Sequence, residues 1–138
     1  MEDTGIRAIK LQEVKGGELI GLIQTELGWN FDFANKLTVE CYGGWRIVMH
    51  EGEGKTLLGM RDLSNSENPF EEIMKHLTGF ELVAIFFNTL TDTLLLQMMK
   101  DRVRISLDLF TSSVKHINWK IIGEDFVDSD QANIIKNL

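Results

Sequence analysis

Cysteine and proline are almost absent from this 138-residue chain, which contains one residue of each type. Because Cys41 is the only cysteine, no disulfide can form within the chain, which fits a reducing compartment. The first five residues include two acids and lack the basic start and apolar core of a secretory signal. We therefore expect a cytoplasmic protein.

A long hydrophobic run is missing as well. The most apolar stretch, residues 80–99, is interrupted by Glu81, Asn88, Asp92 and Gln97. A membrane-spanning helix needs about 20 nearly uninterrupted apolar residues. This stretch therefore predicts protein core, and we expect no membrane partner.

Basic residues are in short supply, because 14 lysines and arginines stand against 21 acidic residues and the net charge is −7. Proteins that coat phosphate backbones do so through Lys and Arg, which release counterions. We therefore expect no nucleic-acid partner. An acidic chain is suited to meeting a basic protein, because opposite charges steer the encounter.

The remaining composition, with 43% hydrophobic and 25% charged residues, is that of a globular domain. Residues 29–33, 37–41 and 45–49 alternate between apolar and polar side chains, which is typical of strands with one buried face. Residues 34–36 and the pair Gly43-Gly44 separate these strands. Two glycines accept positive φ without steric cost, so this pair predicts a two-residue hairpin.

The clearest helix signal covers about residues 69–78. Asn68 is a suitable N-cap, Pro69 fits the first helical position, and Glu71 lies three residues after the cap. Apolar residues at 70, 73, 74 and 77 share one helix face, and Gly79 is a suitable stop.

Strand patterns resume over residues 81–87, 93–99, 102–109 and 116–122. Residues 6–14 fit a strand or a loose helix, residues 18–27 fit a short helix, and residues 124–130 read as an acidic connector. A last short helix, capped by Asp128 or Ser129, would reach Leu138.

These patterns predict an α+β fold of mostly antiparallel β-meanders, with about 6–8 strands, one helix at about 69–78, and short N- and C-terminal helices. We expect a single domain over residues 1–138, which could consist of two meander halves, about 29–60 and 80–122, joined by the helix. The strand order, and the choice between one sheet and two, stay open.

No catalytic motif is complete. Gly52–Thr56 resembles the end of a phosphate loop, but Met49 stands where that loop needs its first glycine. His50-Glu51 begins like a zinc-protease motif, but Gly54 replaces the second histidine. Cys41 shares the apolar face of its strand, which predicts a core residue instead of a nucleophile. We expect no catalytic residue, no metal and no cofactor.

Acidic side chains are the remaining candidates for a binding site. They fall in two loop regions of the predicted fold, at Glu51 and Glu53 and at Glu124, Asp125, Asp128 and Asp130. Either they form a solvated face or they dock a basic protein.

The run from Asn35 to Ile47, together with the size and charge of the chain, resembles the small immunity proteins of bacterial contact-dependent growth-inhibition and polymorphic toxin systems. The resemblance covers about half of the chain and carries no catalytic motif. It implies a non-catalytic protein that neutralises one cognate toxin, often a basic nuclease, by direct binding.

Two other functions stay open. The chain could bind or convert a small ligand in a pocket between the sheet and the helix at 69–78, which would need convergent polar groups. It could also be a homo-oligomeric subunit, such as a homodimer, because Leu94–Leu96 and Met98–Met99 place apolar side chains on both faces of one strand.

Overall fold

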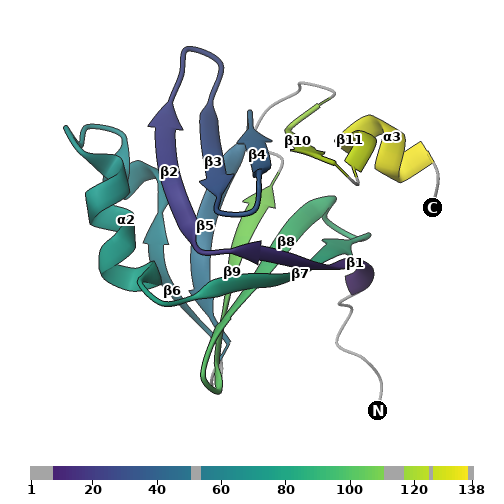
Figure 1. Cartoon of the computed structure of the whole chain (residues 1–138). Coiled ribbons are helices and arrows are strands. Elements are labelled where there is room, and N and C mark those ends of the chain that lie inside the picture. The colour runs from purple at the N-terminus through teal and green to yellow at the C-terminus, as the bar shows by residue number, and fades with distance from the viewer. Residues whose placement is uncertain (1–7, 51–53, 111–116, 125, 137–138) are drawn as a thin grey trace.

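The computed structural model of the chain describes residues 8–50, 54–110, 117–124 and 126–136 (Figure 1); at residues 8–10, 127, 128, 131 and 135 it describes the backbone alone. The strands are β1 (Ala8–Gly17), β2 (Leu19–Gln24), β3 (Trp29–Phe33), β4 (Leu37–Cys41), β5 (Gly44–Met49), β6 (Lys55–Gly59), β7 (Glu81–Asn88), β8 (Thr93–Lys100), β9 (Val103–Phe110), β10 (Trp119–Gly123) and β11 (Phe126–Asp130). The helices are α1 (Met60–Leu63), α2 (Pro69–Leu77) and α3 (Gln131–Lys136).

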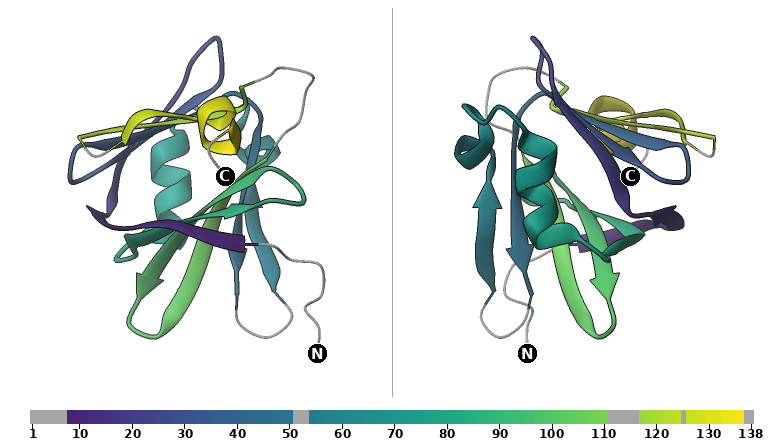
Figure 2. Two further views of the ribbon diagram at one scale, coloured as in Figure 1. Left: turned by 90° about the vertical axis from the view of Figure 1, so that its right-hand side faces the viewer. Right: turned by 60° about the vertical axis from the view of Figure 1, so that its left-hand side comes forward.

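The strands form two antiparallel sheets that face each other (Figures 1 and 2). Sheet A has six strands in the order β1-β7-β8-β9-β5-β6, and sheet B has five in the order β11-β10-β4-β3-β2. The expected antiparallel α+β fold is therefore confirmed in its main features. The expectation of about 6–8 strands was too low.

The chain changes sheets three times along its length. β1 lies in sheet A and β2 in sheet B, β4 in sheet B and β5 in sheet A, and β9 in sheet A and β10 in sheet B. As a result β4 pairs with β10, and β5 pairs with β9. Segments 29–60 and 80–122 therefore contribute strands to both sheets, and neither forms a sheet of its own.

The core lies between the sheets and follows the predicted alternation. Trp29, Phe31 and Phe33 on β3 are buried, as are the alternate residues of β4, β9 and β10 that face the same space. Trp45 packs edge-on against Trp29 and Phe31, with ring centroids 5.4 and 5.3 Å apart. Edge-to-face aromatic pairs add about 1 kcal/mol beyond the area that they bury.

Helix α2 covers the side of the core next to β2, and α3 lies on the opposite side of the molecule (Figures 1 and 2). The sequence correctly predicts where α2 begins: the Asn68 Oδ1 atom caps it by accepting a hydrogen bond from the Glu71 N–H at 3.3 Å. Ile73 and Leu77 are the buried residues of α2. After Leu77 the chain turns away through Gly79, whose φ is +84°.

The Gly43-Gly44 hairpin prediction was wrong. β4 and β5 belong to different sheets, and neither glycine has a positive φ. The glycines are needed because the chain passes close to Phe110: an added Cβ would lie 2.4 Å from the Phe110 carbonyl oxygen at Gly43 and 2.4 Å from its ring at Gly44. Close packing, not turn conformation, explains this pair.

Three local predictions also need correction. Residues 18–27 contain β2 instead of a helix, because these residues pair with β3 along their length. The acidic connector is the β10–β11 hairpin, with β11 at the edge of sheet B. The strand predicted over residues 116–122 begins later, because β10 starts at Trp119 and Ile117 precedes it with an exposed side chain; α1 was not predicted.

Candidate functional site

The six acidic residues predicted to bind a partner are only partly visible. Glu51, Glu53 and Asp125 lie outside the described residues, and Asp128 is described only as backbone on β11. Glu124 is exposed in the β10–β11 hairpin. Asp130 begins α3, because its Oδ1 atom accepts a hydrogen bond from the Asn133 N–H at 2.9 Å. The expected loop location is therefore wrong for Asp128 and Asp130, which lie on β11, and stays a prediction for Glu51, Glu53 and Asp125.

The outer face of sheet B, turned away from the core, carries acidic residues that the sequence analysis did not single out. Strand register aligns two rows of residues across this face. The first row contains Asp130, Lys120, Glu40, Asn30 and Ile23, and the second contains Ile122, Thr38, Asp32 and Gly21. Three carboxylates therefore share one face with two isoleucines.

The two isoleucines on this face are unusually exposed for large apolar residues. Ile23 exposes 57% and Ile122 exposes 41% of its surface. Six large hydrophobic residues are exposed in the described parts of the chain, and five of them lie in the segments that form sheet B. These five are Ile20, Ile23, Leu27, Ile117 and Ile122. Of these five, strand register places Ile23 and Ile122 on the outer face of the sheet, where exposed apolar area can contribute to an interaction surface.

Hydrogen bonds hold the central carboxylates of this face in place. The Thr38 hydroxyl donates to the Asp32 Oδ1 atom at 2.8 Å, and the Tyr42 hydroxyl donates to the Glu40 carboxylate. Burial, the hydrogen bond to Glu40 and the Glu40 charge together raise the pKa of Tyr42 to about 12. Tyr42 therefore remains a neutral donor to Glu40 at physiological pH.

Most of the negative charge belongs to the same half of the molecule. Residues 18–42 and 117–138, which include all of sheet B, contain eight acidic and three basic residues, and so carry −5 of the net charge of −7. Sheet B is thus the acidic layer of the protein.

The outer face of sheet A carries a different set of groups, a chain of four polar side chains on β5, β9 and the residue after β5. The His50 Nε2 atom lies 2.6 Å from the Ser106 Oγ atom, and the Ser106 hydroxyl donates to the Asp108 Oδ1 atom. The Arg46 Nε atom lies 3.6 Å from the Asp108 Oδ2 atom. Because the Ser106 hydrogen is directed to Asp108, His50 must donate through Nε2.

Asp108 is 5% exposed although it lies on the outer face of its sheet. Burial raises the pKa of the Asp108 carboxyl, and the Ser106 hydrogen bond and the Arg46 and His50 charges oppose that rise. Ser106 is 3% exposed, and its hydroxyl is engaged on both sides. In a hydrolase triad the histidine lies between the serine and the acid. Here the serine lies in the middle, so the arrangement does not activate a nucleophile.

Sequence reasoning missed this cluster because 56 positions separate His50 from Ser106. One signal was present: Arg104, Ser106 and Asp108 occupy the outward positions of a strand that is otherwise apolar. That alternation predicts a polar outer face but does not identify the residues from β5 that meet it.

Two surface depressions adjoin the cluster. One, of about 300 Å³, is lined by His50, Phe86, Leu95, Gln97, Arg104 and Ser106. The other, of about 370 Å³, is lined by Arg46, Asn88, Thr91, Thr93, Leu95, Asp108 and Phe110. Their shared residue, Leu95, makes the two depressions neighbours on the outer face of sheet A.

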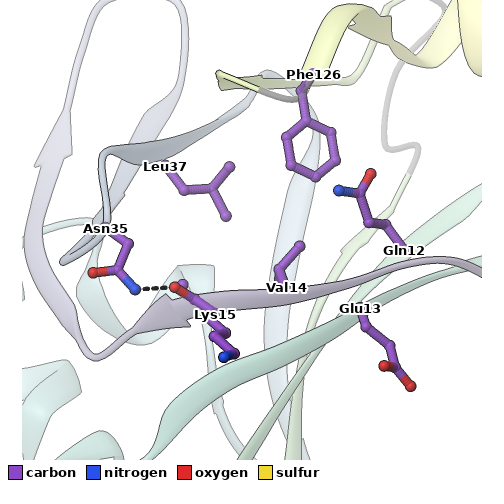
Figure 3. Close-up of a pocket in the computed structure, with 8 residues that line it drawn as sticks. Gln12, Glu13, Val14, Lys15, Asn35, Leu37 and Phe126 are labelled. Carbon is purple, nitrogen blue, oxygen red and sulfur yellow. Dashed lines mark hydrogen bonds between the residues drawn. The ribbon is translucent and has the colours of Figure 1, made fainter.

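A third depression, of about 290 Å³, lies where β1 meets sheet B (Figure 3). Leu37 and Phe126 point toward Val14 on β1, whereas Glu13 points away. The Asn35 side-chain amide donates to the Lys15 carbonyl oxygen and so joins the two sheets at this edge. This depression lies at a contact between the two sheets, and the titratable groups among its lining residues do not converge.

An open depression of about 630 Å³ lies between α2 and β2, in the region where the alternative of a small-ligand pocket would place its site. Two of its lining residues, Glu18 and Glu81, are acidic, and the Glu18 Oε2 atom accepts a hydrogen bond from the Gly79 N–H at 3.3 Å. Glu18 therefore links the start of β2 to the residues that follow α2.

Cys41 is fully buried, as predicted for a core residue. Burial raises the pKa of its thiol to about 12, which keeps it protonated and unreactive. His76 is half-buried on α2, and His116 lies outside the described residues. Within the described part of the chain, no group of three His, Cys, Asp or Glu side chains could hold a metal ion.

No described helix is long and apolar enough to cross a membrane. Comparison with protein-family models, curated proteins and solved structures gives no significant match to this chain.

Proposed function

We propose that the chain is a non-catalytic binding protein that docks a basic protein on the outer face of sheet B. The observation that carries this proposal is the combination of exposed Ile23 and Ile122 with Asp32, Glu40 and Asp130 on one sheet face. Protein interfaces commonly combine an apolar contact area with polar and charged residues around it.

The chemistry of this face favours a partner with lysines or arginines around an apolar contact. Negative charge on the sheet would accelerate the encounter, and the isoleucines would lose contact with water when the partner binds. Because Asp32 and Glu40 are already hydrogen-bonded, their carboxylates lose little conformational freedom on binding.

Together with the resemblance to bacterial immunity proteins, this chemistry leads us to propose a cytoplasmic immunity protein that neutralises a cognate toxin, such as a basic nuclease. In that case the toxin cations that pair with Asp32, Glu40 and Asp130 would be those that otherwise contact nucleic acid. By the same reasoning, Glu124 and the other acidic residues of 124–130 would contact the toxin at the edge of this interface.

The test is quantitative affinity capture from the native host with three forms of the full chain. These are the wild type, the double variant Ile23→Ser/Ile122→Ser, and the control Leu90→Ser. Leu90 is 60% exposed, but it lies in the β7–β8 turn of sheet A and is not part of the outer face of sheet B. We expect one basic protein to be captured in stoichiometric amount by the wild type and L90S and to be lost from the double variant.

The captured protein would then be co-expressed with each form in a test host. We expect the captured protein alone to arrest growth, and the wild type and L90S to restore it. Recovery of only further copies of this chain, capture that is equal for all three forms, or a partner without toxicity would each contradict the immunity proposal.

A further inference from the structure

The outer face of sheet A contains a second candidate binding site, independent of the face proposed for the protein partner. We propose that the depression lined by Phe86, Leu95, Gln97, Arg104 and His50 binds a small organic anion with a flat apolar part. Its volume of about 300 Å³ is at the lower end of the roughly 300–1,000 Å³ typical of ligand pockets.

The depression exists because small side chains occupy the middle of this face. Gln97 on β8 is flanked by Ala84 on β7 and by Ser106 on β9. Both neighbours are buried, so the sheet surface is low between them. Larger side chains border this low area, with Phe86 and Leu95 paired across β7 and β8.

Hydrogen-bond donors dominate the polar side of the depression. Arg104 supplies a guanidinium group, which can only donate, and Gln97 supplies an amide. Neither side chain has a hydrogen-bond or ion-pair partner among the described residues. Because no acidic residue lines the depression, an anion would meet the Arg104 charge without competition.

The hydrogen-bonded cluster of His50, Ser106, Asp108 and Arg46 holds one side of this depression in place. Ser106 accepts from the His50 Nε2–H, and the His50 backbone N–H donates to the Arg104 carbonyl oxygen at 3.2 Å. Arg46 pairs with Asp108, so the one carboxylate of this hydrogen-bonded cluster already has a cation beside it. Among the residues that line the depression, Arg104 is therefore the one that offers a positive charge with no carboxylate of the lining beside it.

Phe86 and Leu95 define the other half of the ligand. They present apolar surface next to the donors, which suits one or two fused rings with a carboxylate at the edge. We therefore choose 2-naphthoate as the probe, and its uncharged analogue 2-naphthamide as the matched control for charge.

The experiment is a titration of the ¹⁵N-labelled full chain with each probe, followed by amide chemical shifts. We expect 2-naphthoate to shift the amides of residues 95–97 and 104–106, and 2-naphthamide to bind about tenfold more weakly, because a charge-assisted hydrogen bond is lost. The variant Arg104→Gln should lose about the same factor for 2-naphthoate and should no longer distinguish the two probes.

Arg102→Gln is the protein control, because Arg102 is an exposed arginine in the adjacent β8–β9 turn and does not line the depression. The affinity of this variant for 2-naphthoate should stay within about a factor of two of the wild type, as expected for the loss of an exposed surface charge outside the depression. Absence of binding to the wild type, equal affinities for the two probes, equal losses in the two variants, or shifts centred on sheet B would each overturn the proposal. None of these outcomes bears on the capture test of sheet B.

Discussion

Arg46 and Asp108 are directly paired across β5 and β9, and the Arg46 Nε atom lies 3.6 Å from the Asp108 Oδ2 atom. The pair is unequal in its surroundings, because the Arg46 side chain is 53% exposed and that of Asp108 is 7% exposed. The arginine can stay hydrated while the carboxylate has lost most of its water. Burial therefore outweighs the pairing, and the pKa of Asp108 is raised.

The raised pKa of Asp108 predicts how stability depends on pH. A carboxyl with a higher pKa in the folded state contributes stability that is complete below its unfolded pKa and is lost as the pH rises through its folded pKa. Asp108→Asn removes this ionisation and keeps an acceptor for the Ser106 hydroxyl. Relative to D108N, the wild type should therefore become less stable as the pH rises above about 4, the ordinary pKa of an aspartate, as measured by urea unfolding.

Asp101→Asn is the control for this comparison, because Asp101 is exposed in the β8–β9 turn. The difference between the wild type and D101N should not follow the trend seen with D108N. A wild type that gains stability over D108N as the pH rises would show that the attraction of Arg46 exceeds the cost of burial.

Tyr42 is the only tyrosine of the chain, so the absorbance change of tyrosine ionisation reports on it alone. With a pKa of about 12, it should remain protonated well beyond the usual range of tyrosine. Glu40→Gln removes the adjacent negative charge and should lower the titration midpoint. The midpoint should stay above the ordinary value, because burial is the larger cause of the shift.

A control for this titration is Glu26→Gln, which changes an exposed carboxylate in the β2–β3 hairpin. E26Q should titrate as the wild type does. Identical midpoints for E40Q and the wild type would mean that Glu40 does not hold the tyrosine hydroxyl.

The Cys41 thiol should not react with Ellman's reagent in the folded protein. It is fully buried, its pKa is about 12, and it donates to the Gly44 carbonyl oxygen at 3.4 Å. Labelling should occur only at the rate of unfolding and should be complete in denaturant. Ser64→Cys provides an exposed thiol as an internal standard, and Cys41 labelling as fast as that of S64C would place it at the surface.

Gly28 should be intolerant of substitution. An added Cβ would lie 2.0 Å from the Cys41 carbonyl oxygen, and that oxygen belongs to the backbone and cannot rotate away. We expect Gly28→Ala to reduce the free energy of unfolding by about 3 kcal/mol, in the upper range for overpacking.

Gly59→Ala is the matched control, because the nearest atom to its added Cβ would be the Asp62 Oδ2 atom at 3.8 Å. Gly59 has φ −123°, which alanine adopts without strain, so the loss should stay below about 1 kcal/mol. Equal losses for G28A and G59A in chemical denaturation would contradict the packing argument.

The sequence predicted the parts of the fold that depend on neighbouring residues. Alternation correctly assigned the buried faces of β3, β4 and β9, and the Asn68, Pro69 and Glu71 pattern located α2. These signals are local, because the side-chain period of a strand and the cap of a helix are set within a few residues.

Sequence alone could not assign each strand to its sheet. Alternation identifies the buried face of a strand but not its partner, so the neighbours β4 and β5 were read as a hairpin although they lie in different sheets. The spacing at residues 18–27 fitted a helix, and only pairing with β3 makes β2 a strand.

The candidate sites were missed for a related reason. Runs of acidic residues are visible in the sequence, whereas Asp32 and Glu40 each stand alone between apolar neighbours and meet other groups only through strand register. In the same way, Arg104 and Gln97 come together only when β8 and β9 pair. Such sites depend on pairings between distant segments, which no local pattern contains.

The three changes of sheet constrain how the protein forms during synthesis. In sheet A, β9 pairs with both β8 and β5, so these two strands are joined only once β9 has been made. In sheet B, β4 gains its second neighbouring strand only when β10 has been made. While the ribosome is still adding these late strands, Ile47 lacks its β9 partner Leu107, and Val39 lacks its β10 partner Ile121. Both sheets can therefore be completed only after most of the chain has emerged from the ribosome.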